Sequence, residues 1–273
     1  MSNPAQLSSG SLPRRERLAA LAAEGADQLG GAPPQATVRW ALKAFPRQSV
    51  ALVTSLQVTG MAILDMAIKI DPSLQVITID SGRLPGETLN FVDEVGRHYG
   101  IQIEVLSPDA TEVSEMVTQH GINLFYRAPE LRLGCCEVRK VRPLNRRLQA
   151  LDAWITGLRR DDSDERSATN EVEVDIEHGG MVKVNPLVQW SQEQLTGYVE
   201  ANKVPMHPLY ARGYTSIGCA PCTRPTAPGE DPRAGRWWWQ EGAKECGLHY
   251  SLLVGDDGRT RVRLTSAKEE ART

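Results

Sequence analysis

Cysteine is the residue type in this chain whose number and spacing most clearly indicate chemistry. Two neighbours, Cys135 and Cys136, precede a second pair, Cys219 and Cys222, in a Cys-x-x-Cys arrangement. Four thiolates can hold either a zinc ion or a [4Fe–4S] cluster. Structural zinc usually takes pairs separated by two to four residues, whereas sequence neighbours point apart unless the backbone bends. The separate iron corners of a cluster tolerate neighbours better, so the pattern favours a cluster over zinc.

The fifth cysteine, Cys246, lies outside both pairs, in a Lys-Glu-Cys-Gly-Leu-His segment that ends at His249. A free thiol with a pKa of about 8.5 is only about 3% thiolate at neutral pH, so a nucleophilic cysteine needs cationic neighbours. Lys244 and His249 are close to it in sequence. The residue pattern alone leaves two interpretations open, an incidental thiol and a nucleophile.

Basic residues follow the first cysteine pair and supply candidate anion ligands. A solvated basic helix is the ordinary interpretation of most of them. Lys140 differs because it follows Cys136 by one helical turn, from where it could reach both a cluster and a bound anion. At helical spacing the set divides between two faces, with Arg139, Arg142 and Arg146 on one and Lys140 and Arg147 on the other.

A second basic set, Arg233 and Arg236, precedes Cys246 in the segment GEDPRAGRWWW. Arginine binds phosphate and sulfate through paired hydrogen bonds, so these two residues are also candidate anion ligands. The three tryptophans at residues 237–239 are more typical of packing than of a stacking platform.

The composition excludes several classes of protein. The net charge of −3 does not suggest an overall nucleic-acid or membrane binder. The first twenty residues have no apolar core of a signal peptide, and the apolar stretch 60–70 is short and interrupted by Asp65. An odd number of cysteines argues against a disulfide framework. We therefore expect a cytoplasmic protein.

Short β-branched runs alternate with helical patterns, which is typical of an α/β fold with a doubly wound parallel sheet. The expected strands cover residues 49–54, 74–79, 101–106 and 154–157, and the expected helices cover 14–24, 36–45, 60–70 and 87–98. Such sheets bind ligands at the carboxyl ends of their strands, where the strand order reverses. The loops 55–60, 80–86 and 158–164 should meet there. Ser55 and Gln57, just before a helix N-terminus, form a candidate anion site.

The rest of the chain is organised around this sheet. We expect residues 1–34 to form an N-terminal arm outside the core. Residues 35–224 should form the α/β domain with the four paired cysteines, and residues 225–273 the C-terminal segment that carries Cys246. From about Pro205 the chain is rich in Pro, Gly and Cys, so its C-terminal part should be Cys-rich and loop-rich. Hairpins are expected over 172–184 and 252–264. Ser191 and Gln194 predict a capping box.

Six motifs carry a resemblance to a known family: IDSGRLPGET (Ile79–Thr88), GCCEVRKVRPL (Gly134–Leu144), TGLRRDDS (Thr156–Ser163), IGCAPCTR (Ile217–Arg224), EDPRAGRWWW (Glu230–Trp239) and KECGLH (Lys244–His249). From about Val50 to His249 the chain resembles the assimilatory adenylyl-sulfate reductases. These are relatives of the phosphoadenylyl-sulfate reductases in the adenine-nucleotide α-hydrolase-like superfamily. The two cysteine pairs mark the cluster-bearing adenylyl-sulfate branch, so the resemblance implies a [4Fe–4S] cluster on Cys135, Cys136, Cys219 and Cys222.

The resemblance also implies an activity in assimilatory sulfate reduction and cysteine biosynthesis. The Cys246 thiolate attacks the sulfur of adenylyl sulfate, AMP leaves, and reduced thioredoxin releases sulfite from the S-sulfocysteine. The cluster orients the site and does not pass electrons. The implied substrate-binding residues are Ser55, Gln57, Asp80, Gly82, Arg83, Leu84, Lys140, Arg159, Arg160, Arg233, Arg236 and His249. Binding to nucleic acid or membrane is not implied, and formation of a homo-oligomer stays open.

Two alternatives remain at this point. The substrate could carry a 3′-phosphate, as in the phosphoadenylyl branch, or the cysteines could hold structural zinc in a nucleotide-binding module without redox chemistry. The chain also departs from many relatives. Its loop 54–60 lacks an acidic residue near Thr59, and 24 residues follow His249. The hairpin expected in that extension could hold the Cys246 segment down or limit the approach of thioredoxin.

Overall fold

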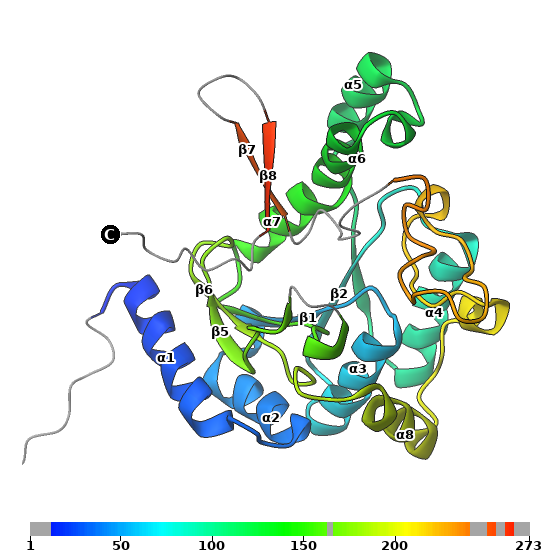
Figure 1. Ribbon diagram of the computed structural model, residues 1–273. Helices are drawn as coiled ribbons and strands as arrows, with labels where there is room; N and C mark the ends of the chain where they lie inside the picture. The colour runs from blue at the N-terminus through cyan, green and yellow to red at the C-terminus, as the bar shows by residue number, and fades with distance from the viewer. Residues whose placement is uncertain (1–11, 163–165, 241–249, 255–259, 265–273) are drawn as a thin grey trace, which may run out of the picture.

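The centre of the molecule is a six-stranded sheet with the strand order β3-β2-β1-β4-β6-β5 (Figure 1). The computed structural model describes residues 12–162, 166–240, 250–254 and 260–264, the last two ranges as backbone. Neighbouring strands are parallel, except that β5 runs antiparallel to β6 at one edge. The predicted α/β class is confirmed. The strands are β1 (Val50–Val53), β2 (Gln75–Ile79), β3 (Ile103–Leu106), β4 (Ala153–Ile155), β5 (Val172–Asp175) and β6 (Met181–Val184).

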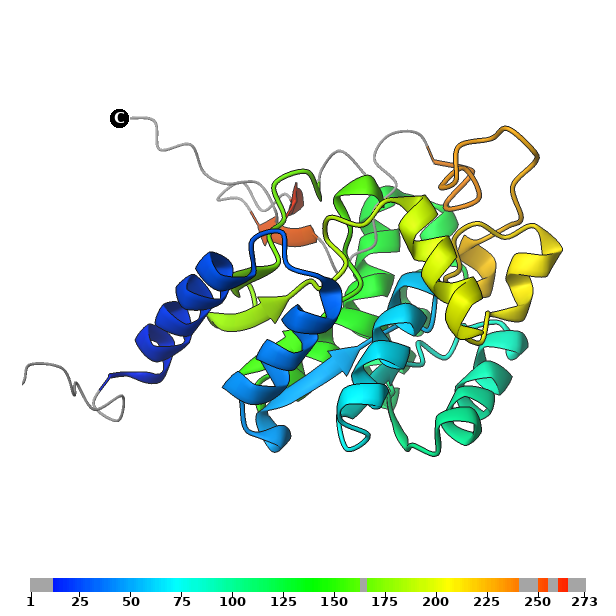
Figure 2. The same cartoon turned by 90° about the horizontal axis from the view of Figure 1, so that it is seen from below.

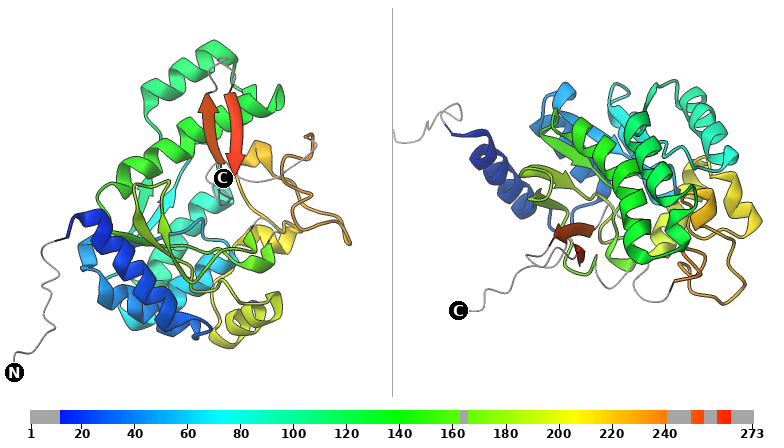
Figure 3. Two further views of the ribbon diagram at one scale, coloured as in Figure 1. Left: turned by 60° about the vertical axis from the view of Figure 1, so that its left-hand side comes forward. Right: turned by 90° about the horizontal axis from the view of Figure 1, so that it is seen from above.

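Helices cover both faces of the sheet because side chains of the central strands alternate between two apolar layers. In β1, Val50 and Leu52 face the larger core, whereas Ala51 faces the smaller one. The opposite, smaller layer is covered by α7 (Arg142–Leu148), as the views from below and above show (Figures 2 and 3). The larger layer receives α1 (Arg14–Leu29), α2 (Pro34–Ala44), α3 (Val58–Ile70), α4 (Gly86–Tyr99) and α8 (Gln192–Asn202).

Helix α1 belongs to this core, so the prediction that residues 1–34 lie outside it is wrong for the helical part. Leu18 and Ala22 are buried in the main cluster, and Arg14 Nε contacts Asp152 Oδ1 at 2.8 Å. The helix packs along β5 and β6. The sequence predicted this helix but not its packing, because the strands that it covers lie more than 140 residues further along the chain.

The order in which strands are added to the sheet reverses beside β1. The chain winds outward from β1 through β2 and β3 and then returns to β4 on the other side of β1. The loops after β1 and β4 therefore border one crevice, which is where such sheets bind ligands. Their backbones are close, since a side chain at Gly157 would come within 3.4 Å of the Gly60 amide nitrogen.

A column of helical segments connects β3 to β4. It comprises α5 (Ala110–His120), η2 (Leu124–Tyr126), α6 (Pro129–Cys136), η3 (Glu137–Val141) and α7. In Figure 1, α5 and α6 stand above the sheet. A third apolar cluster joins this column to residues near the end of the chain, including Phe125, Val138, Cys222 and Trp237.

The remaining predicted elements are also present in the structure. The Ser191–Gln194 capping box is present at α8, and β7 (Tyr250–Val254) pairs antiparallel with β8 (Thr260–Leu264), so the capping box and both hairpins are confirmed. Between α8 and residue 240 the chain forms turns and the short helices η6 (Pro208–Arg212) and η7 (Ala220–Cys222). No helix among the described residues is long and apolar enough to cross a bilayer.

Candidate active site

The four paired cysteines lie in one pocket, although more than eighty residues separate the two pairs. Cys135 and Cys136 end α6, and Cys219 and Cys222 flank η7. Cys136 and Cys222 are buried, and the other two are half-buried. The pocket is also lined by basic side chains and by Phe125 and Trp237.

The helix widens directly after the first cysteine pair. Residues Glu137–Val141 form a π-helical turn, η3, between α6 and α7. A π-turn takes about one more residue than an α-turn and often marks a functional site. Residues four and five positions after Cys135 therefore lie on the same side of the helix as the cysteines. Arg139 and Lys140 accordingly line the pocket with both cysteines.

The loop after β2 contacts both segments that carry the cysteine pairs, at Cys219 and Ala220 on one side and at Arg139 on the other. Ser81 Oγ lies 3.1 Å from Cys219 Sγ, and the Ser81 carbonyl accepts a 2.8 Å hydrogen bond from Arg139 Nη1. The Arg83 carbonyl accepts a 2.8 Å hydrogen bond from the Ala220 amide. Gly82 has a φ of +68°, and a Cβ at this position would lie 3.3 Å from Arg139 Nη1, so a larger residue would strain this loop.

Positive charge surrounds the thiols. Burial raises the pKa of the Cys222 thiol to about 12, and it also raises the pKa of Cys135. Lys140 opposes both shifts, because a nearby cation favours the thiolate. Arg139 likewise lowers the pKa of Cys135, and Arg236 lowers the pKa of Cys222.

The donor set suits a metal centre that takes four thiolates, because the surrounding cations offset the charge that those thiolates would carry. Within the described residues, no three or more His, Cys, Asp or Glu side chains are placed to hold a single metal ion. Two buried donors in this region, Arg236 Nε and Trp237 Nε1, have no hydrogen-bond partner in the part of the chain that the structure describes.

Three residues of this region, Arg132, Arg139 and Ser81, were not among the site residues predicted from the sequence. The expectation that Arg139 shares a face with Arg142 and Arg146, apart from Lys140, is wrong, because the π-turn brings Arg139 and Lys140 into the same pocket. Arg132 is buried, donates from Nε to Gln240 Oε1 at 2.9 Å, and lies 4.4 Å from the Trp237 ring centroid. The predicted Arg236 packs on the same ring at 4.5 Å. A serine in a loop carries no signal of its own, whereas the position of Arg132 three residues before Cys135 was an available signal.

Helical basic residues beyond Lys140 do not face the pocket. Arg142 and Arg146 pair with Glu112 of α5 at 3.5 and 3.6 Å, and Arg147 donates to Glu104 of β3. These contacts assign them to the exterior of the column, as the solvated-helix interpretation expects.

The loop after β1 is shaped by a close contact between Thr54 and Gly60. Thr54 Oγ1 accepts a 3.0 Å hydrogen bond from the Leu56 amide, and Leu56 has a φ of +56°. The α3 amide of Val58 donates to Tyr210 Oη at 3.1 Å. The first turn of α3 lies beside the loop after β4, close to Gly157, and a helix N-terminus is a common site for binding anions.

Ser55 and Gln57 lie in this loop as predicted, but Gln57 has two structural contacts. Its Nε2 donates to Ser55 Oγ at 2.9 Å, and its Oε1 accepts from the Ile217 amide at 2.8 Å. Gln57 thus ties the loop to the segment that leads to Cys219. The Ser55 side chain is exposed at the crevice.

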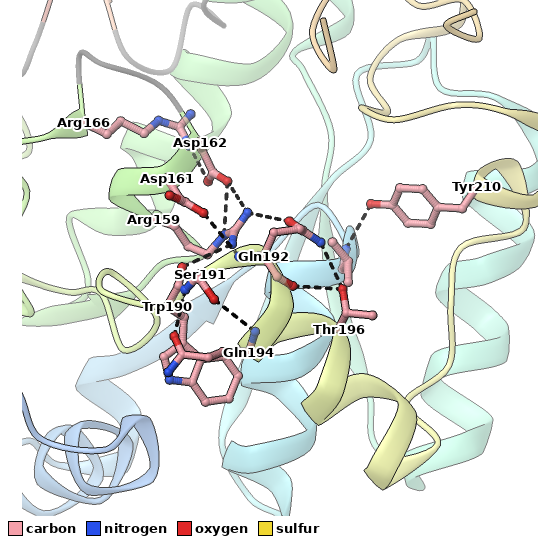
Figure 4. A network of polar contacts seen from close by, with 11 residues as sticks. Arg159, Asp161, Asp162, Arg166, Trp190, Ser191, Gln192, Gln194, Thr196 and Tyr210 are labelled. Atoms are coloured by element: carbon pink, nitrogen blue, oxygen red, sulfur yellow. Dashed lines mark hydrogen bonds and ion pairs between the residues drawn. The ribbon is translucent and has the colours of Figure 1, made fainter. Parts of the chain in front are cut away.

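Arg159 lies in a dense polar network beside α8 (Figure 4). Its guanidinium donates to Asp162 Oδ1, the Trp190 carbonyl and Gln192 Oε1, at distances of 2.8 to 3.2 Å. Asp161 Oδ2 accepts from the Gln192 amide at 3.2 Å. These contacts give Arg159 the role of organising the loop after β4.

The other predicted substrate residues occupy several places. Arg160 donates from Nε to the Thr169 carbonyl at 2.8 Å, and Asp80 Oδ1 accepts from the Gly82 amide. Arg83 lines the cysteine pocket and donates to Asn123 Oδ1 at 3.0 Å. Leu84 and Arg233 are half-buried in their loops. Cys246 and His249 lie outside the described residues.

Similarity to known proteins assigns the chain to a family. A model of the phosphoadenosine phosphosulfate reductase domain matches residues 49–225. The chain belongs to this family. The resemblance of the six motifs is thereby confirmed at the level of the family.

Curated relatives of this family cover most of the chain. A Burkholderia cepacia protein named adenosine 5′-phosphosulfate reductase is 44% identical over 206 residues, which cover 75% of this chain and 82% of the relative. A protein of the same name from Allochromatium vinosum is 42% identical, in a match that covers 74% of this chain and 78% of the relative.

Solved structures agree with the fold. A Candida auris phosphoadenylyl-sulfate reductase in complex with phosphate is 30% identical, with a TM-score of 0.62, in a match that covers 77% of this chain and 97% of that one. A Candida glabrata FMN adenylyltransferase is 13% identical, has a TM-score of 0.50, and matches 83% of this chain and 81% of its own. The second likeness concerns the fold alone.

Proposed function

We propose that this chain reduces adenylyl sulfate to sulfite and AMP, as a step of sulfate assimilation. The observation that carries the proposal is the four-cysteine pocket within a member of this family. Its relatives named adenosine 5′-phosphosulfate reductase are 42–46% identical over most of the chain. A zinc-bearing module without redox chemistry has no comparable support.

The proposed reaction has two stages. The Cys246 thiolate attacks the sulfur of adenylyl sulfate, the bond from sulfur to the bridging oxygen breaks, and AMP leaves with the electron pair. The enzyme then carries an S-sulfocysteine. A reduced dithiol protein, proposed to be thioredoxin, releases the sulfo group as sulfite and supplies two electrons.

Substrate binding is assigned to the crevice between β1 and β4. The exposed Ser55 hydroxyl and the amides at the start of α3 would receive the phosphate, because a helix N-terminus favours anions. Lys140 and Arg236 would face the sulfate from the cysteine pocket. Arg159 would hold the loop that carries Arg160 in place, rather than contact the anion itself.

The four cysteines are proposed to hold a [4Fe–4S] cluster. When bound, the cluster would supply a rigid anchor and a fixed charge beside the sulfate. Arg139 would fix the loop that contains Ser81, and Lys140 would neutralise part of the thiolate charge that otherwise repels an anionic substrate. The cations of the pocket support this assignment because they suit a thiolate-rich centre.

The test is an anaerobic preparation with an iron and sulfide assay, followed by mixing with adenylyl sulfate and intact-mass analysis. We expect about four irons per chain and one added sulfo group that maps to Cys246. Cys246→Ser should keep the iron and bind AMP but form no adduct. Zinc without iron would refute the cluster, and normal sulfite release by Cys246→Ser would refute the nucleophile. A faster reaction with the 3′-phosphorylated substrate would refute the substrate assignment.

A further inference from the structure

An aromatic surface lies next to the cysteine pocket. We call the side chains Tyr126, Trp238 and Trp239 the aromatic patch. Tyr126 is 44% exposed and Trp238 is 41% exposed, and they are the exposed members of the Phe, Tyr and Trp side chains that the structure describes. Both contact Trp239, with ring centroids 4.4 and 4.9 Å apart. The exposed aromatic surface of the described chain is therefore concentrated at one place.

This patch is held rigidly from beneath. Tyr126 Oη donates to the Pro221 carbonyl at 2.9 Å, within the turn between Cys219 and Cys222. Phe125 lies under the patch, 4.7 Å from the Tyr126 ring and 6.4 Å from the Trp239 ring. Packing of the core explains Phe125 and Trp237, which are buried. It does not explain why Trp238 remains in solvent.

Cys246 follows the aromatic patch closely along the chain, and this limits how far apart the two can be. Cys246 is six positions after Gln240, the last described residue before it, and Gln240 follows Trp239 directly. An extended chain spans at most about 3.6 Å per residue, so the Cys246 backbone is within about 22 Å of Gln240. A protein that reacts with the Cys246 sulfur can therefore contact the aromatic patch at the same time.

We propose that the aromatic patch is the docking surface for the dithiol protein that reduces the S-sulfocysteine. This inference rests on the proposed function. Tyr and Trp are the residue types that dominate binding energy at protein interfaces. Redox complexes are commonly small and transient, so a few exposed rings at the centre of the contact suffice. Arg127 and Glu130, which follow Tyr126 closely in the sequence, are exposed and are available for a polar rim.

A dithiol protein docked on the patch reduces the S-sulfocysteine by thiol exchange at Cys246 Sγ. A thiolate of the dithiol protein attacks Cys246 Sγ, the bond between Sγ and the sulfo sulfur breaks, and sulfite leaves with the electron pair. A mixed disulfide results. The second thiol of the partner loses its proton and attacks the partner's own sulfur, which releases the Cys246 thiolate. The partner ends as a disulfide, having given two electrons.

The experiment separates docking from chemistry in the full-length, iron-loaded chain. Trp238→Ala is compared with Trp238→Phe and with the control Leu89→Ala, because Leu89 is 43% exposed on α4, outside the patch. Three rates are measured for each variant: formation of the sulfo adduct, release of sulfite by dithiothreitol, and release of sulfite by reduced thioredoxin over a range of concentrations.

We expect Trp238→Ala to lower kcat/KM for thioredoxin about five- to tenfold, the loss typical of an interface aromatic residue. Adduct formation and release by dithiothreitol should stay within about twofold, because a small thiol needs no docking surface. Trp238→Phe should recover much of the loss, and Leu89→Ala should resemble the unmodified chain.

Unchanged thioredoxin kinetics in Trp238→Ala overturn the docking surface while leaving the proposed function intact. Slower adduct formation in that variant also overturns it, because the ring would then cover the chain's own site. If the unmodified chain forms no adduct, the proposed function fails and the docking role fails with it.

Discussion

Gly60 is a position in the proposed binding crevice where a single methyl group should be costly. A Cβ at residue 60 would lie 2.0 Å from Thr54 Oγ1 and 3.1 Å from Thr54 Cβ. Thr54 is buried, and its hydroxyl accepts the Leu56 amide hydrogen bond. Gly60→Ala must therefore move either the threonine or the first turn of α3.

The expected magnitude combines two effects. Overpacking a buried site costs about 1–3 kcal/mol, and losing the Thr54–Leu56 hydrogen bond costs about 0.5–1.5 kcal/mol. We therefore expect Gly60→Ala to lower the free energy of unfolding by about 2–4 kcal/mol. AMP should also bind more weakly, because the displaced turn carries the amides at the start of α3.

The assay is anaerobic urea unfolding, with AMP titration as a second measurement. Gly197→Ala is the matched control, because Gly197 lies in helix α8 with open space around it, and alanine there should add about 0.5–1 kcal/mol. Thr54→Ala removes the clashing oxygen, so the double variant with Gly60→Ala should be more stable than the sum of the two single effects. Additive losses, or a Gly60→Ala loss below about 0.5 kcal/mol, would refute the steric argument.

Three further predictions concern other parts of the molecule. His207 is buried; its Nδ1 accepts a hydrogen bond from the Leu209 amide, and its Nε2 lies 2.9 Å from Thr88 Oγ1. Burial lowers the pKa of His207 below 6.5. The unfolded chain then takes up a proton that the folded chain refuses, so stability should fall below pH 6.5 by up to about 1.4 kcal/mol per pH unit. His207→Gln should remove this slope in urea unfolding between pH 7 and 5.5, and an unchanged slope would contradict the assignment. Lys140→Ala should slow adduct formation at least about tenfold (about 1.4 kcal/mol), because it removes a cation from the pocket. The control Arg146→Ala should keep the rate of adduct formation within about twofold, because Arg146 pairs with Glu112 outside the pocket. Equal rates for the two variants in the mass assay would show that the pocket charge is unimportant. Arg159→Met should cost about 2–3 kcal/mol in the free energy of unfolding, because it removes one of the two arginines that pair with Asp162 and the donor to Gln192 Oε1 and the Trp190 carbonyl. A loss confined to AMP affinity would show that Arg159 contacts substrate.

The strands and helices were largely predictable because their signals are local. The buried run that forms β1 and the apolar spacing that forms α3 fall within two residues of their expected bounds. The capping box at Ser191 follows from two side chains three residues apart, and it is present. Local patterns did not reveal that α1 packs on the sheet, since its partner strands β5 and β6 lie more than 140 residues away.

In the candidate site, too, residues in a local pattern were predictable, and roles that depend on distant contacts were not. The types and spacing of the four cysteines were sufficient to predict that they act together, and the structure places them in one pocket. Lys140 was distinguished from its basic neighbours by its distance along the helix from Cys136, and it lines that pocket. Gln57 and Arg159 were predicted as substrate ligands, but each makes several contacts within the protein, which no local pattern could indicate.

The residue types and their spacing show which chemistry is available to this protein: five cysteines, a group of basic residues after the first pair, and a sheet whose loops include a candidate anion site. Which of the charges face the thiols follows from the packing of the folded chain. Arg139 turns into the pocket through a π-turn, while Arg142 and Arg146 turn out toward Glu112. The reason is physical: residue type fixes what a group can do, whereas its electrostatic effect depends on distance and burial, and those are set by contacts between segments far apart in the chain.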